Sequence, residues 1–237
     1  ETNSFGGNAL KLTAYGLQAR VGELNRAAAV IAKSALGDKG YVAGSVGPTG
    51  VFAKGEGGKT EPAEFYEAFR QQAIALAAGG ADAIVVETMW SATEATQAIR
   101  ATKENTSLPV ICTFTFSKGP RGFRTAVGLS PEKVAEAALN AGADVVGANC
   151  GNGIEQMIEV AGLIRAAHPN ALVMIQANAG LPTYENGAAV YKESPQDMAS
   201  RVEQLISAGA NIIGGCCGTT PAHIRAMAEA VHSVAVR

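Results

Sequence analysis

The chain has 237 residues, of which 47% are hydrophobic and 17% are charged, and its formal net charge is -2. This balance excludes a disordered chain and offers no strongly basic surface to a polyanion. No apolar run approaches the roughly 18 residues that a membrane span needs, and no secretory signal opens the chain. We therefore expect one soluble, cytoplasmic domain, residues 1–237, with neither nucleic acid nor membrane as a partner.

Short β-branched runs alternate with alanine-rich stretches of helical period, which is typical of βα units around a parallel sheet. Three strands follow near-copies of one Gly-Ala-Asp/Asn phrase, at 80–82, 142–144 and 209–211, in which the glycine ends the preceding helix. The spacing of the copies indicates βα units of about thirty residues. The predicted strands are residues 41–46, 83–87, 110–116, 145–149, 172–176 and 212–215.

Helices are predicted to begin shortly after the strands. Ser130, Ser194 and Thr220 each precede a proline, and each offers a hydroxyl N-cap. Ser91 with Glu94 predicts a capping box. Loops that follow strands lie on the carboxyl-terminal face of a parallel sheet, where barrels and open sheets bind their ligands. The longest irregular segments are predicted on this face, at residues 47–62, 118–129 and 178–193.

Three of the four cysteines end predicted strands. Cys150 ends one strand, and the adjacent Cys216 and Cys217 end another, two strands later. In a closed barrel, the inward residues of alternate strands meet in one layer. Neighbouring residues of a regular strand point to opposite sides, so the adjacent pair reaches one ion only where the strand breaks, which the flanking glycines permit. Cys112 lies within a strand and is predicted to be a core residue.

Two interpretations of the three strand-end cysteines stay open on spacing alone. Free cysteine is among the most buried residue types and packs as a small hydrophobic group. Alternatively, three thiolates bind zinc and leave its fourth tetrahedral position open, as in catalytic rather than structural zinc sites. Strand position and the neighbouring glycines do not decide between these two interpretations.

Two phrases around these cysteines resemble a known family. Gly-Ala-Asn-Cys at 147–150 and Gly-Gly-Cys-Cys-Gly-Thr-Thr-Pro at 214–221 are similar to the zinc motifs of homocysteine S-methyltransferases. The likeness runs over nearly the whole chain, and it implies a (β/α)8 TIM barrel whose zinc-binding and catalytic residues are Cys150, Cys216 and Cys217. It also implies an enzyme that transfers a methyl group to the thiol of homocysteine, giving methionine.

Further positions match the family one by one. The resemblance implies that Glu87 holds the amino group of homocysteine and that Asn178 lies near the zinc. It also implies that the backbone around Thr2 and Phe5 contacts the amino acid. Taken without the resemblance, Glu87 is an exposed strand-end carboxylate. His223 is expected to be a solvated residue of a first helical turn, with a position near the site as the alternative.

The beginning of the sequence departs from the family pattern. Members begin with a strand that ends in an Asp-Gly-x-x-Gly phrase, whose aspartate contacts homocysteine, and the sequence has no such phrase. We therefore expect an N-terminally incomplete barrel that lacks the first strand and most of the second, and that exposes unpaired strand edges.

The implied mechanism follows from charge. A thiol with a pKa of about 8.5 is mostly protonated at neutral pH, and binding to zinc removes that proton. The zinc-bound thiolate of homocysteine then attacks the methyl group of the donor. Candidate donors are a methylcobalamin-carrying domain or protein, betaine and S-methylmethionine. Two alternatives stay open: a zinc methyltransferase for a different thiol or a methylated amine, and an inactive barrel that binds zinc or thiols.

Overall fold

The computed structural model describes residues 1–185 and 187–235. No helix among these residues is both long and apolar enough to cross a membrane. The predicted single domain 1–237 stays a prediction, and three of its residues lie outside the described ones: Asn186, Val236 and Arg237.

The chain divides into two compact units. Strands β3 (Val110–Phe114) and β6 (Val145–Gly153) and helix α5 (Pro131–Asn140) contribute residues to both units. Unit 1 consists of Glu1–Cys112 with Glu136–Val145, and unit 2 consists of Thr113–Ala135 with Val146–Arg237.

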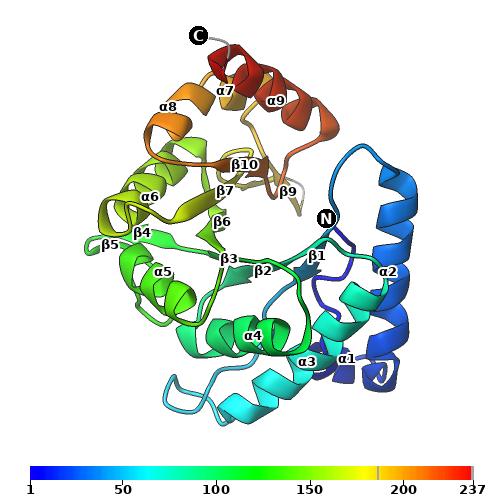
Figure 1. Ribbon diagram of the computed structural model, residues 1–237. Helices are drawn as coiled ribbons and strands as arrows, with labels where there is room; N and C mark the ends of the chain where they lie inside the picture. Colours follow the sequence, from blue (N-terminus) through cyan, green and yellow to red (C-terminus); the bar gives the residue numbers. More distant parts are fainter. Residues whose placement is uncertain (186, 236–237) are drawn as a thin grey trace. The chain divides into compact units, whose positions relative to one another are not determined.

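Unit 1 alternates strands and helices, as the sequence predicts. Its remaining elements are α1 (Ala9–Thr13), the 3-10 helix η1 (Gln18–Arg20), α2 (Val21–Leu36), β1 (Ala43–Val46), α3 (Pro62–Ala78), β2 (Ala83–Met89) and α4 (Ala92–Asn105). Strands β1 and β2 pair in parallel, with Ala43 opposite Ala83. Helix α3 lies between α2 and α4 (Figure 1), and it buries Phe65, Phe69 and Leu76 in the core.

Unit 2 has the same alternation with two added hairpins. Its remaining elements are β4 (Ser117–Gly119), β5 (Gly122–Arg124), α6 (Ile154–Ala167), β7 (Leu172–Asn178), β8 (Thr183–Glu185), β9 (Ala188–Val190), α7 (Pro195–Ala199), α8 (Val202–Ser207), β10 (Ile212–Gly215) and α9 (Pro221–Ala235). Strand β7 lies between β6 and β10. It pairs in parallel with β10, with Met174 opposite Ile212. Only glycine fits at position 147 of β6, because a Cβ there would lie 1.8 Å from the carbonyl oxygen of Met174.

A reciprocal pair of hydrogen bonds forms where three strands begin. Each pair involves the last residue of one copy of the Gly-Ala-Asp/Asn phrase. The glycines of the three copies have φ between +93° and +106°, which confirms the predicted helix ends. The Asp82 N–H donates to the Val42 carbonyl (2.8 Å), and the Asp82 carboxylate accepts from the Val42 N–H (2.7 Å). The Lys33 ammonium and the Val42 N–H hold the pKa of Asp82 below its usual value. The same pair joins Asp144 to Val110 in unit 1 and Asn211 to Val173 in unit 2.

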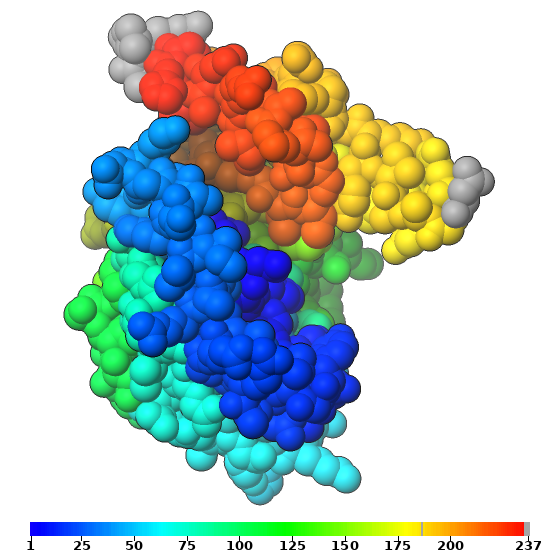
Figure 2. Space-filling model, turned by 90° about the vertical axis from the view of Figure 1, so that its right-hand side faces the viewer, coloured from blue at the N-terminus to red at the C-terminus, as the bar shows by residue number. Residues whose placement is uncertain are grey.

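All six predicted strands are present, and the α/β class with parallel strands is confirmed. The eight-stranded barrel and its lack of the first strands stay predictions. Two of the three segments predicted to be irregular instead contain short antiparallel hairpins, β4/β5 and β8/β9. These strands are only three residues long, shorter than the runs of about four to eight residues that indicate a strand, so the sequence gives no strand signal there. Figure 2 shows the second hairpin, in yellow, projecting beyond helix α9, in orange and red.

The predicted capping box at the start of α4 is only half formed. Ser91 Oγ accepts a hydrogen bond from the Glu94 N–H (3.0 Å), which confirms Ser91 as the N-cap. The Glu94 carboxylate turns instead to the loop after β1 and accepts from the Thr49 N–H (2.7 Å). Glu94 is fully buried, its second carboxylate oxygen has no hydrogen-bond partner among the described residues, and burial raises its pKa to about 7.

This buried carboxyl predicts a specific dependence of stability on pH. The pKa of Glu94 in the folded protein lies above its ordinary value of 4.5. The contribution of Glu94 to folding stability is therefore largest below pH 4.5 and is lost as the pH rises to about 7. Glu94→Gln keeps an oxygen for the Thr49 N–H and removes the charge. We expect the variant to be more stable than the parent at about pH 8, by at most about 3 kcal/mol, and to match it at about pH 4.

Urea unfolding of both proteins across this pH range measures the difference. Glu229→Gln, which changes an exposed glutamate of α9, serves as the control. An equal pH dependence in the parent and in Glu94→Gln would contradict the assignment.

Candidate metal centre

Unit 2 brings the three predicted cysteine ligands together. Cys150 lies within β6, and Cys216 and Cys217 follow β10 directly. The Cys150 and Cys217 Sγ atoms are 3.7 Å apart, and the Cys216 and Cys217 Sγ atoms are 4.0 Å apart. All three sulfurs lie within 4.8 Å of one another, and they form the only group of three or more possible ligands among the described His, Cys, Asp and Glu residues.

A left-handed backbone turn presents the first of these thiols. Strand β6 continues past its predicted end at residue 149, but Cys150 has φ +60° and Gly151 has φ +74°. Such a conformation is uncommon and unfavourable for a residue with a side chain, and it persists where the surrounding structure enforces it. Gly151 is required there, because a Cβ would lie 2.7 Å from the carbonyl oxygen of Phe116.

The second strand end breaks as the adjacent cysteines require. The Cys216 N–H donates to the Ala177 carbonyl (2.8 Å), so pairing with β7 continues through Cys216. The Cys217 N–H donates instead to the Asn178 side-chain oxygen (3.1 Å), and the Cys217 carbonyl accepts from the Ala179 N–H (3.0 Å). This change of partner turns the chain, and both thiols then face the same cluster, as the glycine-flanked pair predicts.

The geometry of the cluster fits a zinc ion. Zinc–sulfur bonds of about 2.3 Å at tetrahedral angles place two thiolate sulfurs about 3.8 Å apart. The observed separations of 3.7 and 4.0 Å lie on either side of this distance. No pair has the sulfur separation of about 2.05 Å that defines a disulfide, and all three cysteines are free. The trio therefore has the donor set and spacing of a three-thiolate zinc site.

The thiols strongly influence one another's ionisation. A hydrogen bond from the Cys216 thiol lowers the pKa of Cys150 to about 5, against the opposing effect of burial. The bond to Cys150 and burial raise the pKa of Cys216, and burial with the Cys150 charge raises that of Cys217. Without a cation, one thiolate forms readily and the others resist ionisation. Full deprotonation of the cluster therefore requires a nearby positive charge.

Asn178 is the one other predicted site residue in this unit, and it belongs to the cluster. Besides accepting from the Cys217 N–H, its side chain hydrogen-bonds the Cys150 thiol. It thus contacts cysteines from both strand ends. Its predicted position near the metal ligands agrees with this geometry, while its role toward zinc stays a prediction.

The predicted substrate residues Thr2, Phe5 and Glu87 lie in unit 1, around Ser45 of β1. The Ser45 N–H donates to Thr2 Oγ1 (2.9 Å), and the Ser45 hydroxyl donates to the Glu87 carboxylate (2.5 Å). The Phe5 carbonyl accepts from the Gly47 N–H (2.9 Å). Glu87 is only 8% exposed, so the alternative of an exposed strand-end carboxylate is wrong.

Two polar neighbours of the thiols were not predicted from the sequence. The Asn149 amide donates to the Cys216 sulfur (3.8 Å) and accepts from the Thr113 hydroxyl (2.8 Å). Tyr191, next to hairpin β8/β9, hydrogen-bonds the Cys217 thiol. Asn149 is part of the phrase before Cys150 and could have been identified, whereas no sequence signal connects Tyr191 with residues 26 positions away.

The prediction of a solvated His223 is wrong. This side chain is 7% exposed, and its Nδ1 accepts from the Thr220 N–H (3.1 Å) at the start of α9. Its Nε2 then carries the proton and donates to the Glu193 carbonyl (2.9 Å). His223 thus supplies the side-chain half of a capping box, with histidine in the place of the usual glutamate, and these contacts are structural.

The chain is similar to proteins of a known family. Residues 1–231 match the model described as homocysteine S-methyltransferase. The chain is 33% identical to the methionine synthase of Mycobacterium tuberculosis (strain ATCC 25618 / H37Rv) over 251 residues, covering 99% of this chain and 20% of that protein. It is 32% identical to the methionine synthase of Mycobacterium leprae (strain TN), covering 98% of this chain and 20% of that protein. The chain thus spans about a fifth of these relatives.

Solved structures show the same fold. The homocysteine methyltransferase MmuM from Escherichia coli, in its oxidised form, superimposes with a TM-score of 0.74 at 22% identity, covering 96% of this chain and 77% of that one. Its metallated form gives a TM-score of 0.72 at 21% identity, covering 95% and 77%. The chain belongs to the homocysteine S-methyltransferase family, and this membership supports the predicted enzyme class, a methyltransferase.

The turn after Cys217 yields a testable prediction about metal binding. Gly218 has φ +79°, and a Cβ there would lie 2.2 Å from Cγ of Tyr191. We expect Gly218→Ala to displace Tyr191 and distort the turn that orients Cys217, and so to lower the zinc content of the purified protein. Gly128→Ala is the matched control, because Gly128 has φ +88° but no neighbouring atom within 4 Å. Equal zinc content in two equally folded variants would contradict the prediction.

Proposed function

We propose that this chain binds zinc through Cys150, Cys216 and Cys217 and transfers a methyl group to the thiol of homocysteine, giving methionine. The observation that carries the proposal is the convergence of three free thiols within 4.8 Å, at spacings that suit a tetrahedral zinc ion. Membership of the family supports the substrate, and the metallated form of the E. coli relative supports a metal in this fold.

The three cysteines supply ligands and charge. When bound, zinc acts as a Lewis acid that favours the thiolate form of a substrate thiol at neutral pH. Cys150, Cys216 and Cys217 would supply three of the four ligands of a zinc ion, and their combined negative charge exceeds that of the ion, so a substrate thiolate beside them would retain electron density for attack. Cys217 is exposed and Cys150 is half-buried, so a substrate can reach the cluster from solvent.

Neighbouring side chains hold the ligands in place. Asn178 contacts the Cys217 N–H and the Cys150 thiol, and Asn149 donates to Cys216. Hydrogen bonds of this kind orient metal ligands, and removing them typically weakens metal binding about ten- to hundredfold. The left-handed backbone at Cys150 likewise restricts the direction of its side chain.

Glu87 is proposed to bind the ammonium group of homocysteine. Its carboxylate is buried and accepts a hydrogen bond from Ser45, which holds one oxygen in a fixed position. A buried carboxylate with a fixed geometry suits a single ammonium group, and the backbone around Thr2 and Phe5 is proposed to contact the same amino acid. We propose that Glu87, Thr2 and Phe5 belong to the predicted TIM barrel, in which the strand ends share one face.

The methyl donor is proposed to be methylcobalamin carried by another domain or protein. The similarity to methionine synthases supports this choice over betaine or S-methylmethionine. The matched region is a fifth of those relatives, which leaves most of their length for other tasks.

Replacing one ligand tests the proposal directly. We expect Cys217→Ala to weaken zinc binding by more than about hundredfold and to abolish homocysteine methylation, because two thiolates remain where three are needed. Zinc stoichiometry and methionine formation are the measurements. Cys112→Ala is the matched control, since Cys112 is a fully buried core residue of β3 and is predicted to leave both unchanged. Intact zinc and activity in Cys217→Ala would refute the proposal.

Glu87 provides a second test, confined to substrate binding. Glu87→Gln keeps the size of the side chain and the bond from Ser45 but removes the charge. We expect the KM for homocysteine to rise about ten- to hundredfold, as for loss of a charge-assisted hydrogen bond, while zinc content stays unchanged. An unchanged KM would show that Glu87 does not bind the ammonium group.

A further inference from the structure

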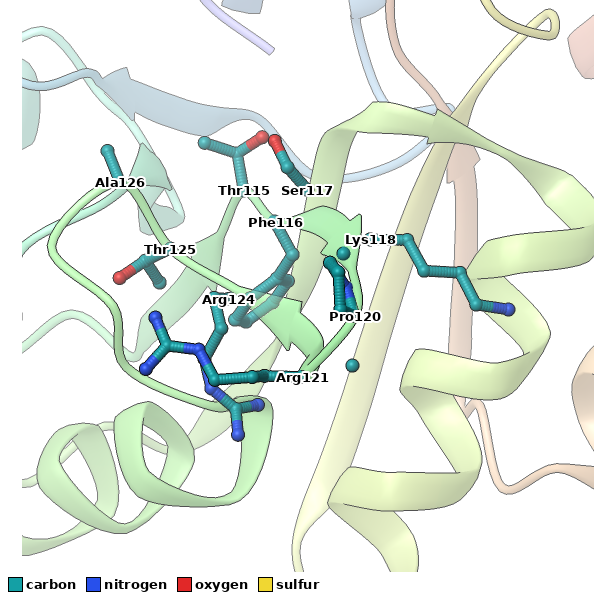
Figure 3. A pocket seen from close by; sticks show the side chains of 11 residues that line it. Thr115, Phe116, Ser117, Lys118, Pro120, Arg121, Arg124, Thr125 and Ala126 are labelled. Carbon is teal, nitrogen blue, oxygen red and sulfur yellow. The ribbon is translucent and has the colours of Figure 1, made fainter.

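Hairpin β4/β5 and its flanks form a pocket in unit 2. The pocket has a volume of about 330 Å³ and is lined by residues 115–122 and 124–126 (Figure 3). That volume lies within the range of small-molecule sites, about 300 to 1,000 Å³. It is large enough for part of an organic ligand.

The pocket carries positive charge that the protein does not neutralise. Arg121 and Arg124 both line it, and neither takes part in any ion pair found among the described residues. Arg124 is held by a bond from its guanidinium to the Phe123 carbonyl (2.6 Å). The third cation of the hairpin, Lys118, forms an ion pair with Glu159 of α6 (2.7 Å), and Figure 3 shows it extending away from both arginines.

Two arginines on one small pocket imply an anionic ligand. Their like charges raise the energy of the empty site, and an anion bound to both would remove that repulsion. Guanidinium groups match carboxylate and phosphate oxygens through paired N–H donors. The hydroxyl groups of Thr115 and Ser117, at the opposite side of the pocket in Figure 3, provide further hydrogen-bonding groups.

The floor of the pocket is joined to the strand that carries Cys150. The Asn152 side chain donates to the carbonyl of Phe116 (2.8 Å), a lining residue. Gly151 packs so closely on Thr115 that a Cβ would lie 2.7 Å from its Oγ1. The residues that line the inner pocket therefore contact the two residues that follow Cys150 in the chain.

We propose that this pocket, termed the arginine pocket, binds the anionic group of the methyl donor. The inference rests on the proposed function, because it assumes that a donor approaches the thiol cluster. The shared chemistry is a carboxylate or a phosphate, held by Arg121 and Arg124 through their paired N–H donors. Homocysteine, bound through Glu87 in the proposed mechanism, does not use this pocket.

Binding of simple anions tests the pocket without any catalysis. Titration calorimetry with inorganic phosphate and with acetate, on the full chain, measures the affinity of each probe. We expect at least one probe to bind, and to bind about tenfold more weakly to Arg121→Gln and to Arg124→Gln. Arg225→Gln, on α9, is the control and should bind as the parent does. Absence of binding by both probes, or equal binding by all variants, would overturn the proposal.

Kinetics of methyl transfer separates this proposal from the proposed function. In the two pocket variants we expect the donor KM to rise about tenfold and the homocysteine KM to stay constant. The phosphate-bearing donor methylcobalamin and the carboxylate-bearing donors betaine and S-methylmethionine distinguish the two anions. Methyl transfer with an unaffected donor KM would overturn the arginine pocket alone. No methylation with any donor, in a chain that binds the probes through Arg121 and Arg124, would overturn the proposed function alone.

Discussion

Register between β7 and β10 is fixed at both ends of the strand pair, and the position of two thiols depends on it. At the start, Asn211 exchanges two hydrogen bonds with Val173, and at the end the Cys216 N–H donates to Ala177. A slip of one residue would turn every side chain of β10 to the opposite face. The polar residue of a repeated three-residue phrase thus determines which way Cys216 and Cys217 point.

The thiol cluster combines backbone strain with repulsion between like charges, and contacts elsewhere in unit 2 must offset both energies. Cys150 has a left-handed backbone, and full ionisation of the three thiols places like charges about 4 Å apart. Hydrogen bonds from Asn149 and Asn178 hold sulfurs that would otherwise separate. These hydrogen bonds orient the thiols within the cluster, and binding of a cation there would stabilise unit 2.

Much of the fold and the centre of the site could be predicted from the sequence. Strands and helix ends follow from β-branched runs and from glycines such as Gly209, because these signals are local. The trio of cysteines follows from strand ends and from family resemblance. Tyr191, Ser45 and the buried state of His223 could not be predicted, since they depend on contacts between segments distant in sequence. The short hairpins were missed because their pairing is set by turns rather than by apolar alternation.

Hairpin β4/β5 is attached to the strand of Cys150 through the main chain of Phe116, which accepts the bond from Asn152. A backbone carbonyl is the same in every amino acid, so this attachment does not depend on which side chains the hairpin carries. Arg121 and Arg124 could therefore be exchanged during evolution without moving Cys150. Under the proposed function, the side chains that bind the anion of the donor can thus change while the thiol ligands keep their positions.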